Sequence, residues 1–242
     1  MTRGVVRSAS LDYTLFRRQS RTAAMGTSGV MFDWDGVLMD SLGASFNVYN
    51  KIFAKLGVRE LTKAEFLEFQ SPNWYEFYER IGLPERFWKA ADDDWLNLYD
   101  EEKPDLHPDA MRCLATLKGR GFRLALVSNG SRDRVTEELE RLGVRPFFDS
   151  VEFGAEKEHL KPSPYMLVKT LDRLGLTPPQ AVYVGDSPAD VQAAKNARVP
   201  SIALARGPIQ AGRLRAENPD HMFGGLEEMT SFLADGAAEP GP

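Results

Sequence analysis

The stretch MFDWDGVLMDS, residues 31–41, is the most informative part of the sequence for the fold. A hydrophobic run that begins at residue 29 ends in Asp33 and Asp35, and Gly36 follows them. A continuous apolar run is typical of a strand whose two faces are both buried, as in a parallel sheet covered by helices. Glycine permits a sharp turn that can bring Asp35 back toward Asp33. The stretch therefore predicts a central strand that opens into a pair of acidic side chains.

Four further apolar runs are typical of buried strands, and helical segments separate them. The predicted strands span residues 29–34, 122–128, 150–153, 181–185 and 201–205. The predicted helices, bounded by proline, serine or glycine, span residues 108–121, 131–143, 163–175 and 187–197. In the third helix, Val168, Leu171 and Leu174 are expected to share the buried face. The alternation predicts a doubly wound, Rossmann-like α/β fold with a parallel sheet.

One long interval interrupts this alternation. Residues 43–105 contain no convincing strand and are predicted to form four helices, which is more structure than a simple crossover needs. We expect residues 43–105 to form a small helical domain over the sheet edge, with residues 28–42 and 106–235 as the α/β core. Residues 1–27 hold five arginines and one acidic residue. They are expected to be a disordered extension, and a targeting segment is the alternative.

Composition excludes several classes of protein. The net charge of −5 gives no reason to expect broad nucleic-acid binding. The single cysteine, Cys113, excludes an intramolecular disulfide framework and a cysteine-only metal site. No run of 18 apolar residues is present, so no transmembrane helix is expected. A cytoplasmic location is the expectation, with organellar targeting by the arginine-rich segment as the alternative.

Polar residues gather at the predicted carboxyl ends of the strands, where open α/β sheets place their sites. They are Asp33, Asp35, Ser128, Asn129, Asp186 and Asp190, with Lys161 in the loop after the third strand. Two like charges about 4 Å apart repel by about 4 kcal/mol at an effective dielectric constant of about 20. One lysine cannot offset four carboxylates, so some must be protonated or a hard cation must lie among them. Oxygen ligands without histidine suggest Mg²⁺.

A carboxylate site that holds Mg²⁺ suits phosphoryl transfer, in which positioning and charge neutralisation carry most of the catalysis. An aspartate can attack the phosphorus and form an aspartyl-phosphate, which water then cleaves. A second group must protonate the leaving oxygen and later activate water. Asp33 and Asp35 provide such a pair.

The sequence resembles the haloacid dehalogenase-like hydrolases, because all four short motifs of that superfamily occur in order within residues 30–205. They are the Asp-x-Asp-Gly of FDWDGVLMDS, Ser128 in LVSNGS, Lys161 in HLKPSP and the acidic GDSPAD. The position of the helical insert resembles the C1 cap subclass, which includes phosphoglycolate phosphatases and beta-phosphoglucomutases. The chain departs from the family at Ala197-Arg198, where a small residue and glycine are common. An arginine there is strained if the position needs a positive φ.

The resemblance implies a role for each motif residue at the metal and in proton transfer. Asp33 is the implied nucleophile and a Mg²⁺ ligand, and Asp35 is the implied general acid/base with its backbone carbonyl on the metal. Asp186 is the third implied ligand. Asp190 is expected to support these ligands or to orient Lys161.

The remaining motif residues are expected to hold the phosphoryl group. Ser128 and the Asn129 backbone would hydrogen-bond it, and Lys161 would bridge it to Asp33. For the leaving group, Arg59, Asn73, Trp74 and Tyr75 are the candidate contacts from the cap. The aromatic residues of this set can equally form the cap's own core.

Asp35 favours phosphoester chemistry, since the dehalogenases and phosphonate-cleaving members of the superfamily lack that second aspartate. We therefore expect a Mg²⁺-dependent phosphatase that acts on a small phosphorylated metabolite, such as phosphoglycolate or a sugar phosphate. A phosphomutase of the beta-phosphoglucomutase type is the alternative. A non-catalytic binding protein on the same scaffold is a minor alternative, against which the presence of Asp33, Asp35 and Lys161 argues.

Overall fold

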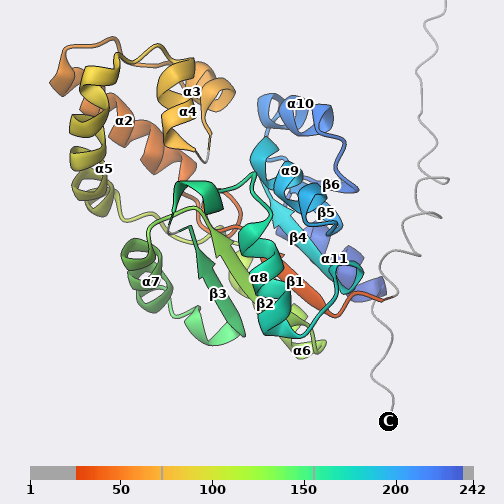
Figure 1. The fold of residues 1–242 in the computed structure, drawn as a ribbon. Coiled ribbons are helices and arrows are strands. Elements are labelled where there is room, and N and C mark those ends of the chain that lie inside the picture. Colours follow the sequence, from red (N-terminus) through yellow and green to blue (C-terminus); the bar gives the residue numbers. More distant parts are fainter. Residues whose placement is uncertain (1–25, 72, 155, 237–242) are drawn as a thin grey trace, which may run out of the picture.

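A single sheet of six parallel strands forms the centre of the computed structural model, which describes residues 26–71, 73–154 and 156–236. The strands are β1 (Gly29–Phe32), β2 (Arg123–Ser128), β3 (Ser150–Phe153), β4 (Ala181–Gly185), β5 (Ser201–Leu204) and β6 (His221–Phe223). Their order in the sheet is β3-β2-β1-β4-β5-β6 (Figure 1). The strand order therefore reverses beside β1, which is the point of an open α/β sheet where ligands bind.

Helices cover both faces of this sheet. They are α6 (Ala110–Gly119), α7 (Arg132–Arg141), α8 (Tyr165–Leu174), α9 (Pro188–Asn196), α10 (Pro208–Ala216) and α11 (Leu226–Gly236). Successive residues of β1 serve opposite faces: Val30 and Phe32 pack with α6, α7 and α11, whereas Met31 packs with α8 and α9. This two-residue alternation of wholly buried side chains explains why the strand is apolar throughout. The predicted doubly wound α/β fold is confirmed.

The predicted elements agree with the observed ones except in the C-terminal part. Each of the five predicted strands lies at or just inside its expected ends, but β6, α10 and α11 were not predicted. The prediction for Val168 was wrong, because its side chain is 45% exposed. Helix α8 instead turns Met166, Leu167 and Leu171 toward the sheet.

The interval between β1 and β2 contains the four predicted helices. They are α2 (Leu42–Leu56), α3 (Lys63–Phe69), α4 (Trp74–Arg80) and α5 (Trp88–Glu102), with a 3-10 turn, η1 (Glu85–Phe87), before α5. These helices share a hydrophobic cluster of their own, which includes Val48, Phe53 and Phe77. Figure 1 shows them as a group beside the sheet. The boundaries of the predicted domains remain a prediction, and so does the predicted extension, most of which lies outside the described residues.

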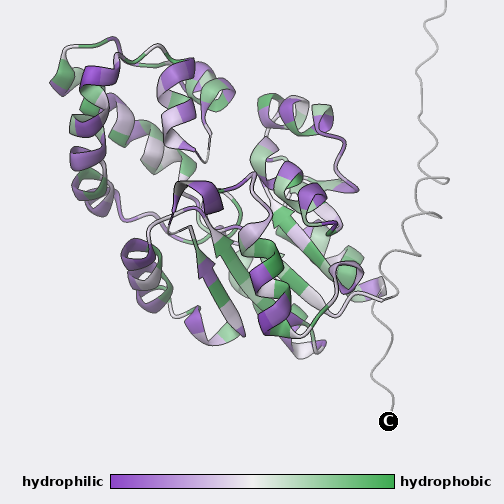
Figure 2. Ribbon diagram, in the orientation of Figure 1, coloured by the Kyte–Doolittle hydropathy of each residue, from purple (hydrophilic) through white to green (hydrophobic). Residues whose placement is uncertain are grey.

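Hydropathy follows the layers of the fold. In Figure 2 the strands of the sheet are mainly hydrophobic, while the helices carry hydrophilic residues along their outer sides. The amphipathic helices thus bury one stripe each against the sheet. Within the described part of the chain, no helix is both long enough and apolar enough to cross a membrane.

Candidate active site

The end of β1 separates three consecutive side chains into different surroundings. The Asp33 N–H donates to the Val184 carbonyl at 2.9 Å, which extends the pairing with β4 beyond the strand. The Trp34 side chain is completely buried in the core, and its Nε1 donates to Glu138 at 2.6 Å. Asp33 and Asp35 therefore lie on either side of a fixed tryptophan. Trp34 thus serves packing.

Gly36 is needed for the turn that follows. Its φ is +78°, a region that residues with a side chain rarely adopt. A Cβ atom at this position would lie 2.2 Å from the Asp186 Oδ2 atom. The turn thus brings the backbone after β1 directly against the acidic end of β4.

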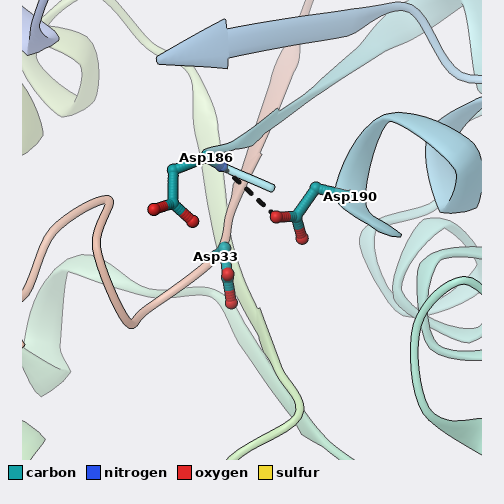
Figure 3. A group of neighbouring side chains, drawn as sticks. All are labelled: Asp33, Asp186 and Asp190. Carbon is teal, nitrogen blue, oxygen red and sulfur yellow. Dashed lines mark hydrogen bonds between the residues drawn. The ribbon is translucent and has the colours of Figure 1, made fainter. Parts of the chain in front are cut away.

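The end of β4 supplies two more carboxylates through the start of α9. Ser187 and Asp190 form a capping box: the Ser187 N–H donates to Asp190 Oδ2 at 3.0 Å, and Ser187 Oγ accepts from the Asp190 N–H. The Asp186 N–H also donates to Asp190 Oδ2, at 3.3 Å. Figure 3 shows Asp33, Asp186 and Asp190 as neighbours, with this hydrogen bond drawn as a dashed line. One carboxylate oxygen from each of the three lies within 4.8 Å of the others.

Lys161 lies at the base of this acidic group and is itself buried. Its Nζ atom lies 2.7 Å from Asp33 Oδ1, 2.7 Å from Asp190 Oδ1 and 3.0 Å from the Tyr183 hydroxyl. Burial alone would lower the pKa of Lys161, but the two carboxylates raise it above its ordinary value. The lysine is therefore a fixed positive charge at the site.

One lysine does not neutralise the acidic group. Burial raises the pKa of Asp33 to about 7; Lys161 opposes this shift and Asp190 adds to it. Burial, followed by the charges of Asp190 and Asp33, raises the pKa of Asp186 well above its ordinary value. The raised pKa values of Asp33 and Asp186 show that Lys161 alone supplies too little positive charge to keep both carboxyl groups ionised. A set of buried carboxylate oxygens fits a hard divalent cation such as Mg²⁺, which Asp33 and Asp186 could hold.

The other two motif carboxylates are held by protein donors. Both oxygens of Asp190 accept hydrogen bonds, from Lys161 and Tyr183 on one side and from Ser187 on the other. Asp190 is therefore suited to support the metal ligands and to orient Lys161. Asp35 does not belong to the group of three carboxylates, and its side chain pairs with Arg134. Its expected role as a metal ligand through the backbone remains a prediction.

Arg134, on α7, forms a bidentate ion pair with Asp35. Its Nη2 lies 2.6 Å from Asp35 Oδ2 and its Nη1 lies 3.2 Å from Oδ1. Arg134 also pairs with Glu138 at 3.1 Å, and its guanidinium lies 5.1 Å from the centre of the Tyr99 ring on α5. Burial would raise the pKa of Asp35, but the charge of Arg134 and hydrogen bonds from Arg134 and Ser41 hold it below its ordinary value.

The end of β2 brings the second motif to the same rim. Ser128 is fully buried, and its Oγ accepts a hydrogen bond from the Gly130 N–H at 2.9 Å. Asn129 Oδ1 accepts from the Lys161 N–H at 2.9 Å, which ties the second motif to the third. The structure therefore gathers Asp33, Asp35, Asn129, Lys161 and Asp186 around one cavity. Ser128 does not line the cavity but is hydrogen-bonded to Gly130, which does.

This cavity has a volume of about 320 Å³ and lies between the strand ends and helices α2 to α5. Of the candidate contacts for the leaving group, Trp74 lines the cavity, whereas Arg59, Asn73 and Tyr75 do not. Arg59 is exposed and pairs with Glu65 at 2.8 Å. Tyr75 packs against the Trp74 and Trp88 rings. The structure thus brings one of these four residues to the site.

Sequence reasoning missed Tyr183, whose hydroxyl contacts Lys161 and Asp190, and two residues on helices. Arg134 is one, and Gln210 on α10 is the other: its Nε2 donates to Asp186 Oδ2 at 2.8 Å and to the Asp186 carbonyl at 2.9 Å. Helix α10 also contacts α3, because Arg213 donates to the Leu67 and Gln70 carbonyls at 2.7 and 2.9 Å. A signal for Arg134 was present, since Arg134 and Glu138 are adjacent to the apolar Val135 and Leu139 along α7.

A sequence model of the haloacid dehalogenase-like hydrolases matches residues 30–204, which include all four motifs. The chain belongs to this family. It is 31% identical to a phosphoglycolate phosphatase of Shigella dysenteriae over 232 residues, covering 85% of this chain and 92% of the relative. It is 29% identical to the pyrophosphatase PpaX of Bacillus velezensis, covering 85% of this chain and 94% of the relative. The expected class of enzyme, a hydrolase of this family, is confirmed.

Solved structures share the fold. A predicted phosphoglycolate phosphatase from Haemophilus somnus aligns with a TM-score of 0.76 at 22% identity, covering 85% of this chain and 97% of that one. A candidate beta-phosphoglucomutase from Thermotoga maritima aligns with a TM-score of 0.68 at 24% identity, covering 86% and 99%. At these identities the similarity establishes the α/β fold alone.

Proposed function

We propose that the protein is a Mg²⁺-dependent phosphatase that hydrolyses a small phosphate monoester through an aspartyl-phosphate on Asp33. The observation that carries this proposal is the buried group of Asp33, Asp186 and Asp190 around Lys161, at the floor of a cavity. Small phosphorylated substrates are also what the names of the curated relatives suggest.

Asp33 is placed to attack the phosphorus. Its Oδ1 atom is engaged by the Trp34 N–H and by Lys161, which fixes the carboxylate and directs the other oxygen toward the substrate. Lys161 offsets the repulsion between this carboxylate and the phosphoryl oxygens. A Mg²⁺ ion held by Asp33 and Asp186, with Asp190 in support, would neutralise the charge of those oxygens.

Asp35 is the proposed proton carrier. The ion pair with Arg134 keeps its carboxyl group ionised, and this is the form that activates water to cleave the aspartyl-phosphate. To protonate the leaving oxygen in the first step, Asp35 must first take up a proton, which requires it to loosen its pair with Arg134. Ser128 and the Asn129 backbone would bind the phosphoryl group from β2.

Phosphate release tests the proposal. The purified protein is assayed on a panel of phosphate monoesters with Mg²⁺ and with EDTA, beside Asp33→Asn and the control Asp93→Asn. Asp93 is a matched control because it is exposed on α5, does not line the cavity and pairs with Lys89. We expect activity in the wild type and in Asp93→Asn that requires Mg²⁺, and a loss of about 10⁴-fold or more in Asp33→Asn.

Other outcomes would favour other functions. Equal activity of the wild type and Asp33→Asn would exclude the covalent mechanism. A rearranged sugar phosphate without net phosphate release would favour the phosphomutase. Binding of phosphate esters without turnover of any of them would favour a non-catalytic binding protein.

A further inference from the structure

The wall of the cavity that faces the carboxylates is aromatic. Six rings line it: Tyr49, Phe66, Trp74, Phe77, Tyr78 and Trp95. They come from α2, α3, α4 and α5. Tyr49 connects four of the other rings, because it lies 4.7 Å from Phe77, 6.2 Å from Phe66, 6.2 Å from Tyr78 and 6.3 Å from Trp95 between ring centres. Trp74 joins this group through Tyr75, whose ring lies 5.5 Å from Trp74 and 6.5 Å from Tyr78. Tyr49, Trp74 and Trp95 are only partly buried and line the cavity. Such a wall favours a planar apolar group over a small hydrated one.

The positive charges at the cavity are already engaged. Among the described residues that line it, the cations are Lys161 and Arg134, and each pairs with two carboxylates. No basic residue of the helical insert is among the described residues that line the cavity, and five of them pair with acids outside it: Lys51, Lys55, Arg59, Arg80 and Lys89. A second anion on the substrate would therefore find no available cation at the aromatic wall.

The negative charges at the cavity also disfavour a second anionic group on the substrate. Four aspartates line it, and one of them, Asp92, belongs to the aromatic side, where it accepts a hydrogen bond from the Tyr78 hydroxyl at 3.0 Å. A carboxylate or a second phosphate on the leaving group would be repelled by Asp92. A neutral ring that carries a hydrogen-bond donor would be accommodated there.

We infer that the substrate is the phosphate monoester of an uncharged aromatic alcohol, of the size of a benzyl or nucleoside group. This inference rests on the proposed phosphatase function and narrows its substrate class. It separates the chain from the substrates in its relatives' names, since phosphoglycolate and pyrophosphate both carry a second anionic group close to the phosphate.

A panel of primary-alcohol phosphates tests the inference without differences in leaving-group reactivity. It comprises benzyl phosphate, uridine 5′-monophosphate, glycerol 3-phosphate and phosphoglycolate. We expect kcat/KM for the first two to exceed that for the last two by about tenfold or more, which corresponds to about 1.4 kcal/mol of differential binding. A preference for phosphoglycolate, or equal rates on all four, would overturn the inference.

Three variants locate the preference in the wall. Trp74→Ala should lower the ratio of kcat/KM for benzyl phosphate to that for glycerol 3-phosphate by about tenfold. Phe87→Ala is the control, because Phe87 does not line the cavity and instead lies under the Arg86 guanidinium, 4.6 Å from the centre of its ring. It should leave this ratio unchanged. Ser45→Arg adds a cation to the cavity lining and should raise the relative rate on phosphoglycolate.

The two proposals fail in distinguishable ways. If Asp33→Asn abolishes turnover while the wild type prefers phosphoglycolate, the phosphatase function stands and the aromatic substrate class is wrong. If no ester is turned over, both are wrong. A ratio that Trp74→Ala leaves unchanged, with circular dichroism showing that the variant is folded, would also contradict the role of the wall.

Discussion

Asp35 is subject to two opposing influences at the scale of a single residue. Burial favours its neutral form, and the guanidinium of Arg134 at 2.6 Å favours its charged form and prevails. Arg134 in turn pairs with Glu138 on α7 and lies over the Tyr99 ring on α5. The charge of Asp35 therefore depends on how these neighbours hold Arg134. Arg134 is thus a positioning residue for proton transfer.

Replacement of Arg134 tests this dependence. In Arg134→Met the pKa of Asp35 should rise. Because ionised Asp35 activates the water that cleaves the aspartyl-phosphate, the acid limb of the pH profile of kcat should then move to higher pH. Loss of one partner from the buried pair with Glu138 should also cost about 3 kcal/mol of unfolding free energy in urea. Arg134→Lys keeps the positive charge but cannot form two parallel hydrogen bonds to the Asp35 carboxylate, so it should move the acid limb less than Arg134→Met does. Arg132→Met, on the exposed side of the same helix, is the control. Coincident profiles for all four proteins would contradict the role.

Among the elements, the turn after β1 is the least tolerant. Gly36→Ala would place a methyl group 2.2 Å from Asp186 Oδ2 in a backbone region unfavourable to alanine. Displacement of Asp186, a proposed metal ligand, by about 1 Å can cost about 100-fold in rate, and we expect at least that loss in kcat/KM. Gly43→Ala, in the first turn of α2, meets no atom within 4 Å and should stabilise the protein by about 0.5 kcal/mol. Normal activity in Gly36→Ala would show that the turn is not required.

The end of α9 contains a strained residue. Arg198, which departs from the family pattern, has a φ of 59° directly after the C-cap residue Ala197. A left-handed conformation costs a residue with a side chain about 1 kcal/mol. Arg198→Gly should therefore raise the free energy of unfolding in urea by about 0.5–1 kcal/mol. Glu137→Gly, at an exposed position in the middle of α7, should lower it by about 1 kcal/mol. Destabilisation by both changes would mean that the Arg198 side chain makes a compensating contact.

The elements that the sequence predicted well have a strong local pattern. β1, β2 and β4 are continuous apolar runs because both of their faces are covered, and glycines mark the ends of α2 and α8. β6 has only three residues, all partly exposed, and thus lacks such a pattern. Val168 fits the helical periodicity of α8 but lies beyond the edge of the sheet-facing stripe, which the sequence alone does not define.

At the scale of the whole molecule, the topology explains which site residues could be predicted. Three of the predicted site residues lie at the carboxyl ends of adjacent strands: Asp33 after β1, Ser128 at the end of β2 and Asp186 after β4. Lys161 lies in the loop after β3. Parallel strands bring these carboxyl ends to one edge of the sheet. Arg134 and Gln210 reach the same site from helices, across 99 and 24 residues of chain respectively. Their partners depend on how α7 and α10 pack, and this information is not local.

The acidic site also sets how the stability of the whole molecule varies with pH and metal. Because the pKa of Asp33 rises from 3.8 to about 7 in the folded chain without metal, its protonated form contributes stability. That contribution is complete below pH 3.8 and is lost as the pH rises through about 7. In EDTA, the stability of Asp33→Asn relative to the wild type should therefore increase as the pH rises from about 5 to about 8. At pH 8, Mg²⁺ at about 100 times its Kd should stabilise the wild type by about 2.7 kcal/mol and the variant by less. Urea unfolding of both proteins measures these differences. A parallel pH dependence of the two proteins in EDTA would mean that Asp33 does not carry the extra proton. Equal gains in stability from Mg²⁺ would mean that Asp33 does not bind the metal.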